Sequence, residues 1–70
     1  MSYQLFTNPD SIADDVYDLR VMLQVSQAGL GQKLGVSNLS VHRWEAGKTR
    51  PHKTFVNKMK RIHQEAMRKA

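Results

Sequence analysis

The sequence contains no cysteine, which excludes disulfide bonds and metal sites built on thiolates. It has no apolar run close to the roughly 20 residues that a membrane-spanning helix needs. Residues 1–6 carry no basic start and no long apolar stretch, so we expect no secretory signal. No segment alternates apolar and polar residues as a half-buried strand would. We therefore expect a cytoplasmic protein made of helices.

The length of the chain also limits what it can do. With 70 residues it is expected to form one domain, which has no room for a deep substrate cavity beside its core. No nucleophile with a neighbouring base and no pair of carboxylates can be argued from the sequence. His42, His52 and His63 share no metal-binding spacing. We therefore expect neither an enzyme nor a bound metal or other cofactor.

Charge is divided unevenly along the chain. Residues 1–26 hold one Arg and four Asp, a net charge of −3, whereas residues 27–70 hold ten Lys or Arg and two Glu, a net charge of +8. Together these give the +5 of the whole chain. A basic part of this kind predicts a polyanionic partner that meets one face of the protein. A solvated basic surface is the alternative, and the charge alone does not decide between the two.

Asn8 and Pro9 predict the start of the first helix. Asn8 can accept a hydrogen bond from a free helix amide, and Pro9 suits the first helical position. Apolar residues then recur at helical spacing and define one buried face, made of Ile12, Val16, Leu19 and Leu23. We expect residues 1–8 to form an N-terminal arm and residues 9–70 to form the folded domain.

Two short helices are expected over residues 27–34 and about 38–46, each preceded by a serine that can cap it. Gly35 ends the first of them, because glycine adopts a positive φ at little cost. Gly31 is expected to face the second helix at the point of closest approach. Val41 and Trp44 are interpreted as core residues, which leaves four side chains on the outward face of the second helix: Asn38, Leu39, His42 and Arg43.

A last helix is expected from His52 or Lys53 towards Arg68. Its buried face repeats at spacings of 4, 3 and 4 residues and consists of Phe55, Met59, Ile62 and Ala66. Its other face is basic, and both phosphate contact and simple solvation explain that face. The whole pattern predicts an all-α bundle of four or five helices.

The stretch from Ser26 to Pro51, SQAGLGQKLGVSNLSVHRWEAGKTRP, resembles the helix-turn-helix domains of the lambda repressor and Cro type. Members share Ser-Gln, Leu with a small residue, Gly-Val-Ser, and a Trp-Glu-x-Gly-x-x-x-Pro ending, and the match runs from about Leu19 to Pro51. The resemblance implies a DNA-binding domain that reads an operator with the helix at about 38–46. Two glycines in one eight-residue helix depart from good helix-forming sequence, at a cost of about 1 kcal/mol each relative to alanine.

The resemblance also implies roles for matching residues. Base-reading side chains are implied at Asn38, Leu39 and Arg43, with His42 on the same rim. Phosphate contacts are implied for Gln27, Ser40, Lys48, Thr49 and Arg50. Gln27 would also brace the first recognition side chain. A structural ion pair is implied between Arg20 and Glu45.

The expected function is that of a bacterial or phage transcriptional regulator, a repressor that acts by covering an operator. A homodimer, at least on DNA, would place two recognition helices in successive major grooves. The long last helix leaves the dimer surface open. Two alternatives remain: an antitoxin-type module that binds a protein partner, with DNA binding secondary, and an architectural or recombination-directionality factor that bends DNA.

Overall fold

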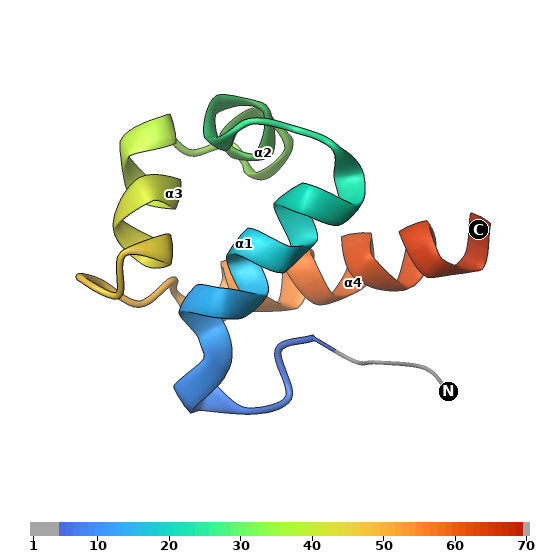
Figure 1. Cartoon of the computed structure of the whole chain (residues 1–70), viewed down its shortest axis with the longest axis horizontal. Helices are drawn as coiled ribbons and strands as arrows, with labels where there is room; N and C mark the ends of the chain where they lie inside the picture. The colour runs from blue at the N-terminus through green and yellow to red at the C-terminus, as the bar shows by residue number, and fades with distance from the viewer. Residues whose placement is uncertain (1–4, 70) are drawn as a thin grey trace.

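The computed structural model of the chain describes residues 5–69. It contains a single 3-10 turn, η1 (Pro9–Ser11), and four α-helices: α1 (Ile12–Leu23), α2 (Gln27–Leu34), α3 (Asn38–Glu45) and α4 (Lys53–Lys69). These residues form no strand. The expected all-α class with four helices is therefore confirmed. Figure 1 shows α1 at the centre, with α2 above it, α3 to the left and α4 below and behind.

Short polar side chains cap the elements where the sequence predicts. Asn8, Ser26 and Ser37 each accept a hydrogen bond from the backbone N–H two or three residues further on, at 3.0, 3.0 and 3.3 Å. Each bond satisfies an amide that has no partner inside the first turn. Gly35 ends α2 with a φ of +77° and Gly47 follows α3 with a φ of +74°. Both lie in the left-handed region that favours glycine.

Two helix ends differ from the expected ones. Pro9 starts a 3-10 turn instead of an α-helix, because the N–H of Ser11 donates to the carbonyl of Asn8 at 3.0 Å and closes a tighter turn. The α-helix itself begins three residues later, at Ile12. α3 ends at Glu45, and Ala46 forms its C-cap.

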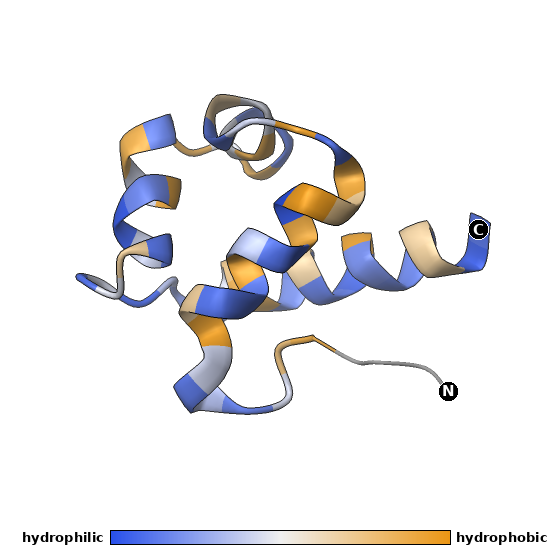
Figure 2. Cartoon of the chain, in the orientation of Figure 1, coloured by the Kyte–Doolittle hydropathy of each residue, from blue (hydrophilic) through white to orange (hydrophobic). Residues whose placement is uncertain are grey.

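Every α-helix contributes to one apolar core. The buried members are Leu5, Phe6, Val16, Leu19, Leu30, Leu34, Val41, Trp44 and Met59. Trp44 packs with its ring centroid 5.7 Å from that of Phe55, which joins α3 to the start of α4 and agrees with the expected core role of Trp44. In Figure 2 hydrophobic positions recur along α1, whereas α4 is hydrophilic over most of its length. No described helix is both long and apolar enough to cross a membrane.

Two residues in the described part of the expected N-terminal arm, Leu5 and Phe6, belong to the core. Leu5 is 3% exposed and Phe6 is 5% exposed. The backbone N–H of Phe6 donates to a carboxylate oxygen of Asp15 at 2.9 Å, and Asp15 is itself buried. Two apolar residues without a helical period carry no local signal of burial, because the contacts that bury them are made with the rest of the fold. Residues 1–4 of the arm lie outside the described residues.

Gly31 makes the closest approach between α2 and the turn that follows it. A Cβ atom at this position would lie 2.6 Å from the backbone oxygen of Val36 and 3.3 Å from the carbonyl of Ser37. The expected close approach is therefore present, but its partner is the backbone of the turn at residues 36 and 37. The N–H of Val36 donates to the carbonyl of Gly31 at 2.9 Å and holds the turn in place. Only glycine fits this contact without a shift.

Candidate nucleic-acid interface

α3 presents an exposed polar face opposite its buried one. Val41 and Trp44 are buried, as expected, and the four outward side chains are all exposed: Asn38, Leu39, His42 and Arg43. Leu39 leaves half of its surface, 50%, in contact with solvent, although it is apolar. The helix that carries these groups has eight residues and is about 12 Å long. A helix of this length and polarity can enter a groove about 12 Å wide.

Ser40 contacts Ser37 at the start of α3. Its backbone N–H donates to the hydroxyl of Ser37 at 3.3 Å, and the two hydroxyl oxygens lie 3.3 Å apart. The side chain is half-buried at the start of α3. Ser40 thus takes part in the cap that begins α3, and its hydroxyl remains near the edge of the exposed face.

Arg20 on α1 and Glu45 on α3 form the ion pair that the resemblance implies. The guanidinium donates twice, from Nε to Oε2 at 2.7 Å and from NH2 to Oε1 at 3.0 Å. A third bond runs from NH1 to the carbonyl of Val25 at 3.3 Å. The two side chains are only 19% and 11% exposed, so solvent screens the pair weakly. Hydrogen bonding to Glu45 raises the pKa of Arg20, which therefore stays charged.

Gln27 extends this ion pair to the outward face of α3. Its side-chain Nε2 lies 3.3 Å from Oε1 of Glu45 and 3.5 Å from Nδ1 of His42. Arg20, Glu45, Gln27 and His42 therefore form one polar network that joins α1, α2 and α3. The resemblance implied that Gln27 braces the first recognition side chain, but its hydrogen bonds within residues 5–69 run to His42 and Glu45 and none runs to Asn38.

The network determines how a neutral His42 is protonated. A carboxylate can only accept hydrogen bonds, so the group of Gln27 that faces Glu45 is its NH2. The same NH2 group faces Nδ1 of His42, which must then accept. With Nδ1 as the acceptor of this contact, a neutral imidazole would carry its ring proton on Nε2. His42 offers a hydrogen-bond donor to a molecule that contacts α3.

Lys48, Thr49 and Arg50 lie in the loop after α3, and all three are exposed. The N–H of Lys48 donates to the carbonyl of Arg43 at 3.0 Å, which ties the start of the loop to the last turn of α3. Pro51 is buried and holds the other end. The loop thus keeps Lys48 beside the last turn of α3, whereas Thr49 and Arg50 line a hollow with Pro9 and Asp10.

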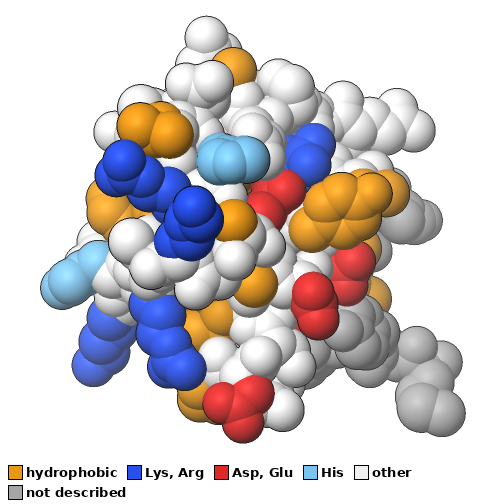
Figure 3. Space-filling model, turned by 60° about the vertical axis from the view of Figure 1, so that its left-hand side comes forward, with side chains coloured by type: hydrophobic (Ala, Val, Ile, Leu, Met, Phe, Trp, Pro, Cys, Tyr) orange, Lys and Arg blue, Asp and Glu red, His pale blue; other side chains and the backbone are white. Residues whose placement is uncertain are grey.

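Charge on the α3 side of the molecule is divided. Figure 3 turns this side forward and shows most of the Lys and Arg side chains in view on the left, with Asp and Glu side chains towards the centre and right. A histidine side chain lies near the top of this face, beside the basic group. The arrangement produces a positive potential on one part of the face and suits a polyanion that covers that part.

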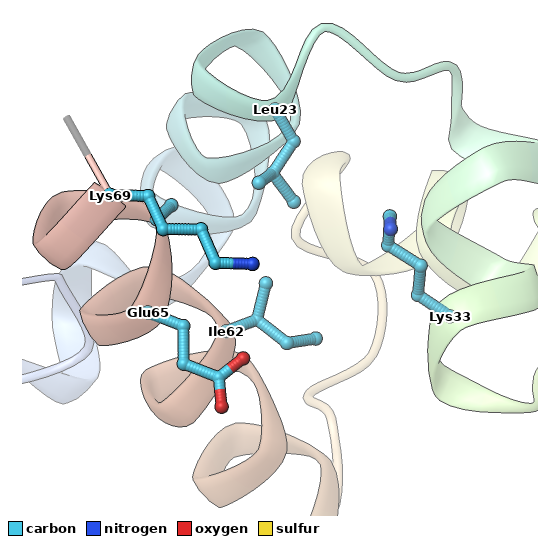
Figure 4. Close-up of a pocket in the computed structure, with 6 residues that line it drawn as sticks. Leu23, Lys33, Ile62, Glu65 and Lys69 are labelled. Atoms are coloured by element: carbon cyan, nitrogen blue, oxygen red, sulfur yellow. The ribbon is translucent and has the colours of Figure 1, made fainter.

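A separate open groove lies between α1, α2 and the C-terminal half of α4. Its volume is about 390 Å³, and Figure 4 shows Leu23 and Ile62 pointing into it from α1 and α4. Lys33, Glu65 and Lys69 form its rim. No candidate base-reading or phosphate-binding residue lines this groove.

His63 is a buried polar residue that sequence reasoning missed. It is 3% exposed on α4, and its Nε2 has no hydrogen-bond partner among residues 5–69. The spacing of four residues from Met59 could have placed it on the inward face. Within residues 5–69 no three His, Asp or Glu side chains gather closely enough to hold a metal ion.

No family model matches the sequence, and the comparisons with curated proteins and with solved structures give no significant match. The exposed side chains of α3 and the polar network behind them are therefore the basis for any function assigned to this chain.

Proposed function

We propose that this protein is a sequence-specific DNA-binding transcriptional regulator of the lambda repressor and Cro type, and that it acts as a repressor. One observation carries the proposal: α3 is short and exposes four base-compatible side chains, and a polar network fixes it to α1 and α2. In this arrangement α2 and α3 act as a helix-turn-helix, with α3 as the recognition helix in the major groove.

The side chains of α3 differ in the base edges that they suit. Arg43 can donate two bonds to the O6 and N7 acceptors of guanine, and Asn38 can pair with the N6 and N7 edge of adenine. Leu39 can contact the methyl group of thymine. His42 adds a donor on Nε2, which suits an acceptor on a base or a phosphate. These preferences predict a site in which guanine, adenine and thymine positions each matter.

Phosphate contacts would hold the duplex against this face. Lys48, Thr49 and Arg50 are exposed in the loop that follows α3, and Ser40 and Gln27 lie at the N-terminal ends of α3 and α2. The N-terminal end of a helix favours an anion through its free amides and its dipole. Two copies of the protein on a two-fold symmetric operator would place their α3 helices about 34 Å apart in successive grooves. Occupancy of the operator, in the nucleoid, would exclude polymerase.

Selection of bound fragments from random DNA tests the proposal directly. We expect a two-fold symmetric motif with a fixed half-site spacing. The variants Arg43→Ala and Asn38→Ala should each relax preference at a different position of a half-site, at a cost of about 1–3 kcal/mol for the preferred base. Gln27→Ala should change base preference in the same way as His42→Ala, because the two side chains contact each other.

Lys48→Ala is the matched control for a phosphate contact. It should weaken all sequences about equally, because phosphates are the same at every base pair. If Arg43→Ala also weakens every sequence equally, Arg43 holds a phosphate and the assignment of the reading face is wrong. If none of these variants changes the affinity for DNA, DNA reading is not the function. An antitoxin-type module then takes its place, with a protein partner as its ligand.

A further inference from the structure

All of the excess positive charge of the protein is found on α4. The helix Lys53–Lys69 contains six Lys or Arg and one Glu, a net charge of +5, which equals the net charge of the whole chain. The remaining residues contain five Lys or Arg and five Asp or Glu, and their charges cancel. Reading of DNA by α3 alone does not explain why the positive charge is concentrated on another helix.

Most cations of α4 lie away from its buried side, and Lys69 borders the groove towards α1 and α2. Met59 and His63 are buried on its inner side, and five of the six cations are exposed: Lys53, Lys58, Arg61, Arg68 and Lys69. In the part of the chain that the structure describes, the sole salt bridge joins Arg20 and Glu45, so no carboxylate pairs with a cation of α4 at salt-bridge distance, although Glu65 lies one turn from Arg61 and Lys69. The result is a basic face about 25 Å long, at 1.5 Å per residue over 17 residues.

This basic face extends away from the proposed recognition helix. In Figure 1 α4 begins near the loop that follows α3 and runs to the opposite side of the molecule. Arg61 and Arg68 lie about 12 Å and 22 Å along the axis from Lys53. The C-terminal half of α4 therefore lies on the side of the molecule opposite to α3.

We propose that the exposed face of α4 is a second DNA-binding surface, which holds the phosphates of a second duplex segment while α3 holds the first. A B-form duplex carries one negative charge per about 1.7 Å of axis, so about 15 phosphates lie along the length of this face. Lys and Arg on one side of a helix bind such a backbone without reading its sequence. The inference rests on the proposed function, and it makes the protein a bridge between two segments of DNA.

A duplex fits this face better than an acidic protein does. A stable protein interface has an apolar core with aromatic or aliphatic anchors. On α4 the only exposed large apolar side chain, among the residues described, is Met67, at 38%. The groove at Leu23 and Ile62 is only partly apolar, since Lys33, Glu65 and Lys69 also line it, and it faces α1 and α2. The outer face of α4 offers charge and length, which are the properties that phosphates recognise.

The test is a capture experiment with two duplexes. One 24-base-pair duplex carrying the selected site is fixed to beads, and a labelled duplex of unrelated sequence and equal length is added with the protein. We expect capture of the labelled duplex that depends on the protein and falls steeply with added salt. The triple variant Lys58→Gln, Arg61→Gln, Arg68→Gln should reduce capture at least tenfold. Its affinity for the bead-bound site should stay within about threefold of the parent.

The variant is designed to keep the fold, because all three side chains are exposed and glutamine forms helices well. Its circular dichroism and melting temperature should match those of the parent. A parent protein that binds the site but captures no second duplex overturns the proposal, as does a variant that captures as well as the parent. A variant that loses affinity for the site itself also overturns it, since α4 would then contact the same duplex.

Failure of the proposed function gives a different result. If selection yields no preferred site, duplexes of random sequence on the beads and in solution still test α4. Capture that is lost in the triple variant then supports the α4 surface without sequence-specific reading by α3. If the protein captures no labelled duplex on the beads even at low salt, both proposals are overturned.

Discussion

Gly31→Ala is a sharp test of the contact between α2 and the turn before α3. The substitution should gain about 1 kcal/mol of helix propensity, because alanine is the better helix former. Against this, the new Cβ would lie 2.6 Å from the backbone oxygen of Val36, well inside ordinary contact. A backbone atom cannot turn away as a side chain can, and the turn is also held by its own bond to Gly31. Such overpacking costs up to about 3 kcal/mol.

The balance is a net loss of about 2 kcal/mol in the free energy of unfolding. A chain of 70 residues has a total of roughly 4–10 kcal/mol, at about 0.05–0.15 kcal/mol per residue. The variant should therefore fold, with a midpoint of thermal unfolding about 8–16 °C lower, at 4–8 °C per kcal/mol. Circular dichroism at 222 nm and a urea titration measure the change, and the slope of the titration should stay constant.

Gly29→Ala is the matched control, since it lies in the same helix and gains the same propensity. Its Cβ would lie 3.1 Å from the Cβ of Val25, a side-chain contact that needs a shift of only a few tenths of an ångström. The two effects nearly cancel, so we expect a stability within about 1 kcal/mol of the parent. If Gly31→Ala instead melts at or above the temperature of Gly29→Ala, the close approach at the turn does not exist and the proposed placement of α3 is wrong.

Three further predictions concern other parts of the molecule. In a double-mutant cycle by chemical denaturation, Arg20→Ala and Glu45→Ala should each cost about 3–5 kcal/mol and the double variant less than their sum; additive costs would mean that the pair contributes nothing. Phe6→Ala should cost about 3 kcal/mol or more in the same assay, whereas a free arm would give no change. Lys48→Ala should reduce the slope of log K for DNA against log salt by about 0.9, and an unchanged slope would remove Lys48 from the phosphate contacts.

The helices and their caps could be predicted because their signals are local. Ser26 and Ser37 can form their bonds within three residues, whatever the rest of the chain does. Gly35 likewise adopts a positive φ that depends on its own backbone. The apolar period of each helix then shows which side is buried. These features determine α2, α3 and the angle at which the turn can join them.

The features that could not be predicted are made by contacts distant in the sequence. The N–H of Phe6 bonds to Asp15, nine residues away, and this contact holds Phe6 in the core. No periodic pattern of apolar residues predicts such a contact. Gln27 could be placed at the start of α2, but its bond to His42 spans 15 residues and depends on the packing of α2 against α3. The sequence indicated a surface on α3, and only the fold shows which side chains support it.

The polar network links the stability of the protein to its proposed reading of DNA. Glu45 accepts bonds from both Arg20 and Gln27 through the same oxygen, Oε1. A substitution of Arg20 on α1 can therefore alter the contact between Gln27 and His42 through this one atom. Arg20 lies on α1 and is bonded to Glu45 and Val25, inside the fold. Loss of its charge would nevertheless free Glu45 to draw the NH2 group of Gln27 away from His42, because an unpaired carboxylate needs donors. A residue behind α3 can thus influence the tautomer of His42, and with it the proposed contact with DNA.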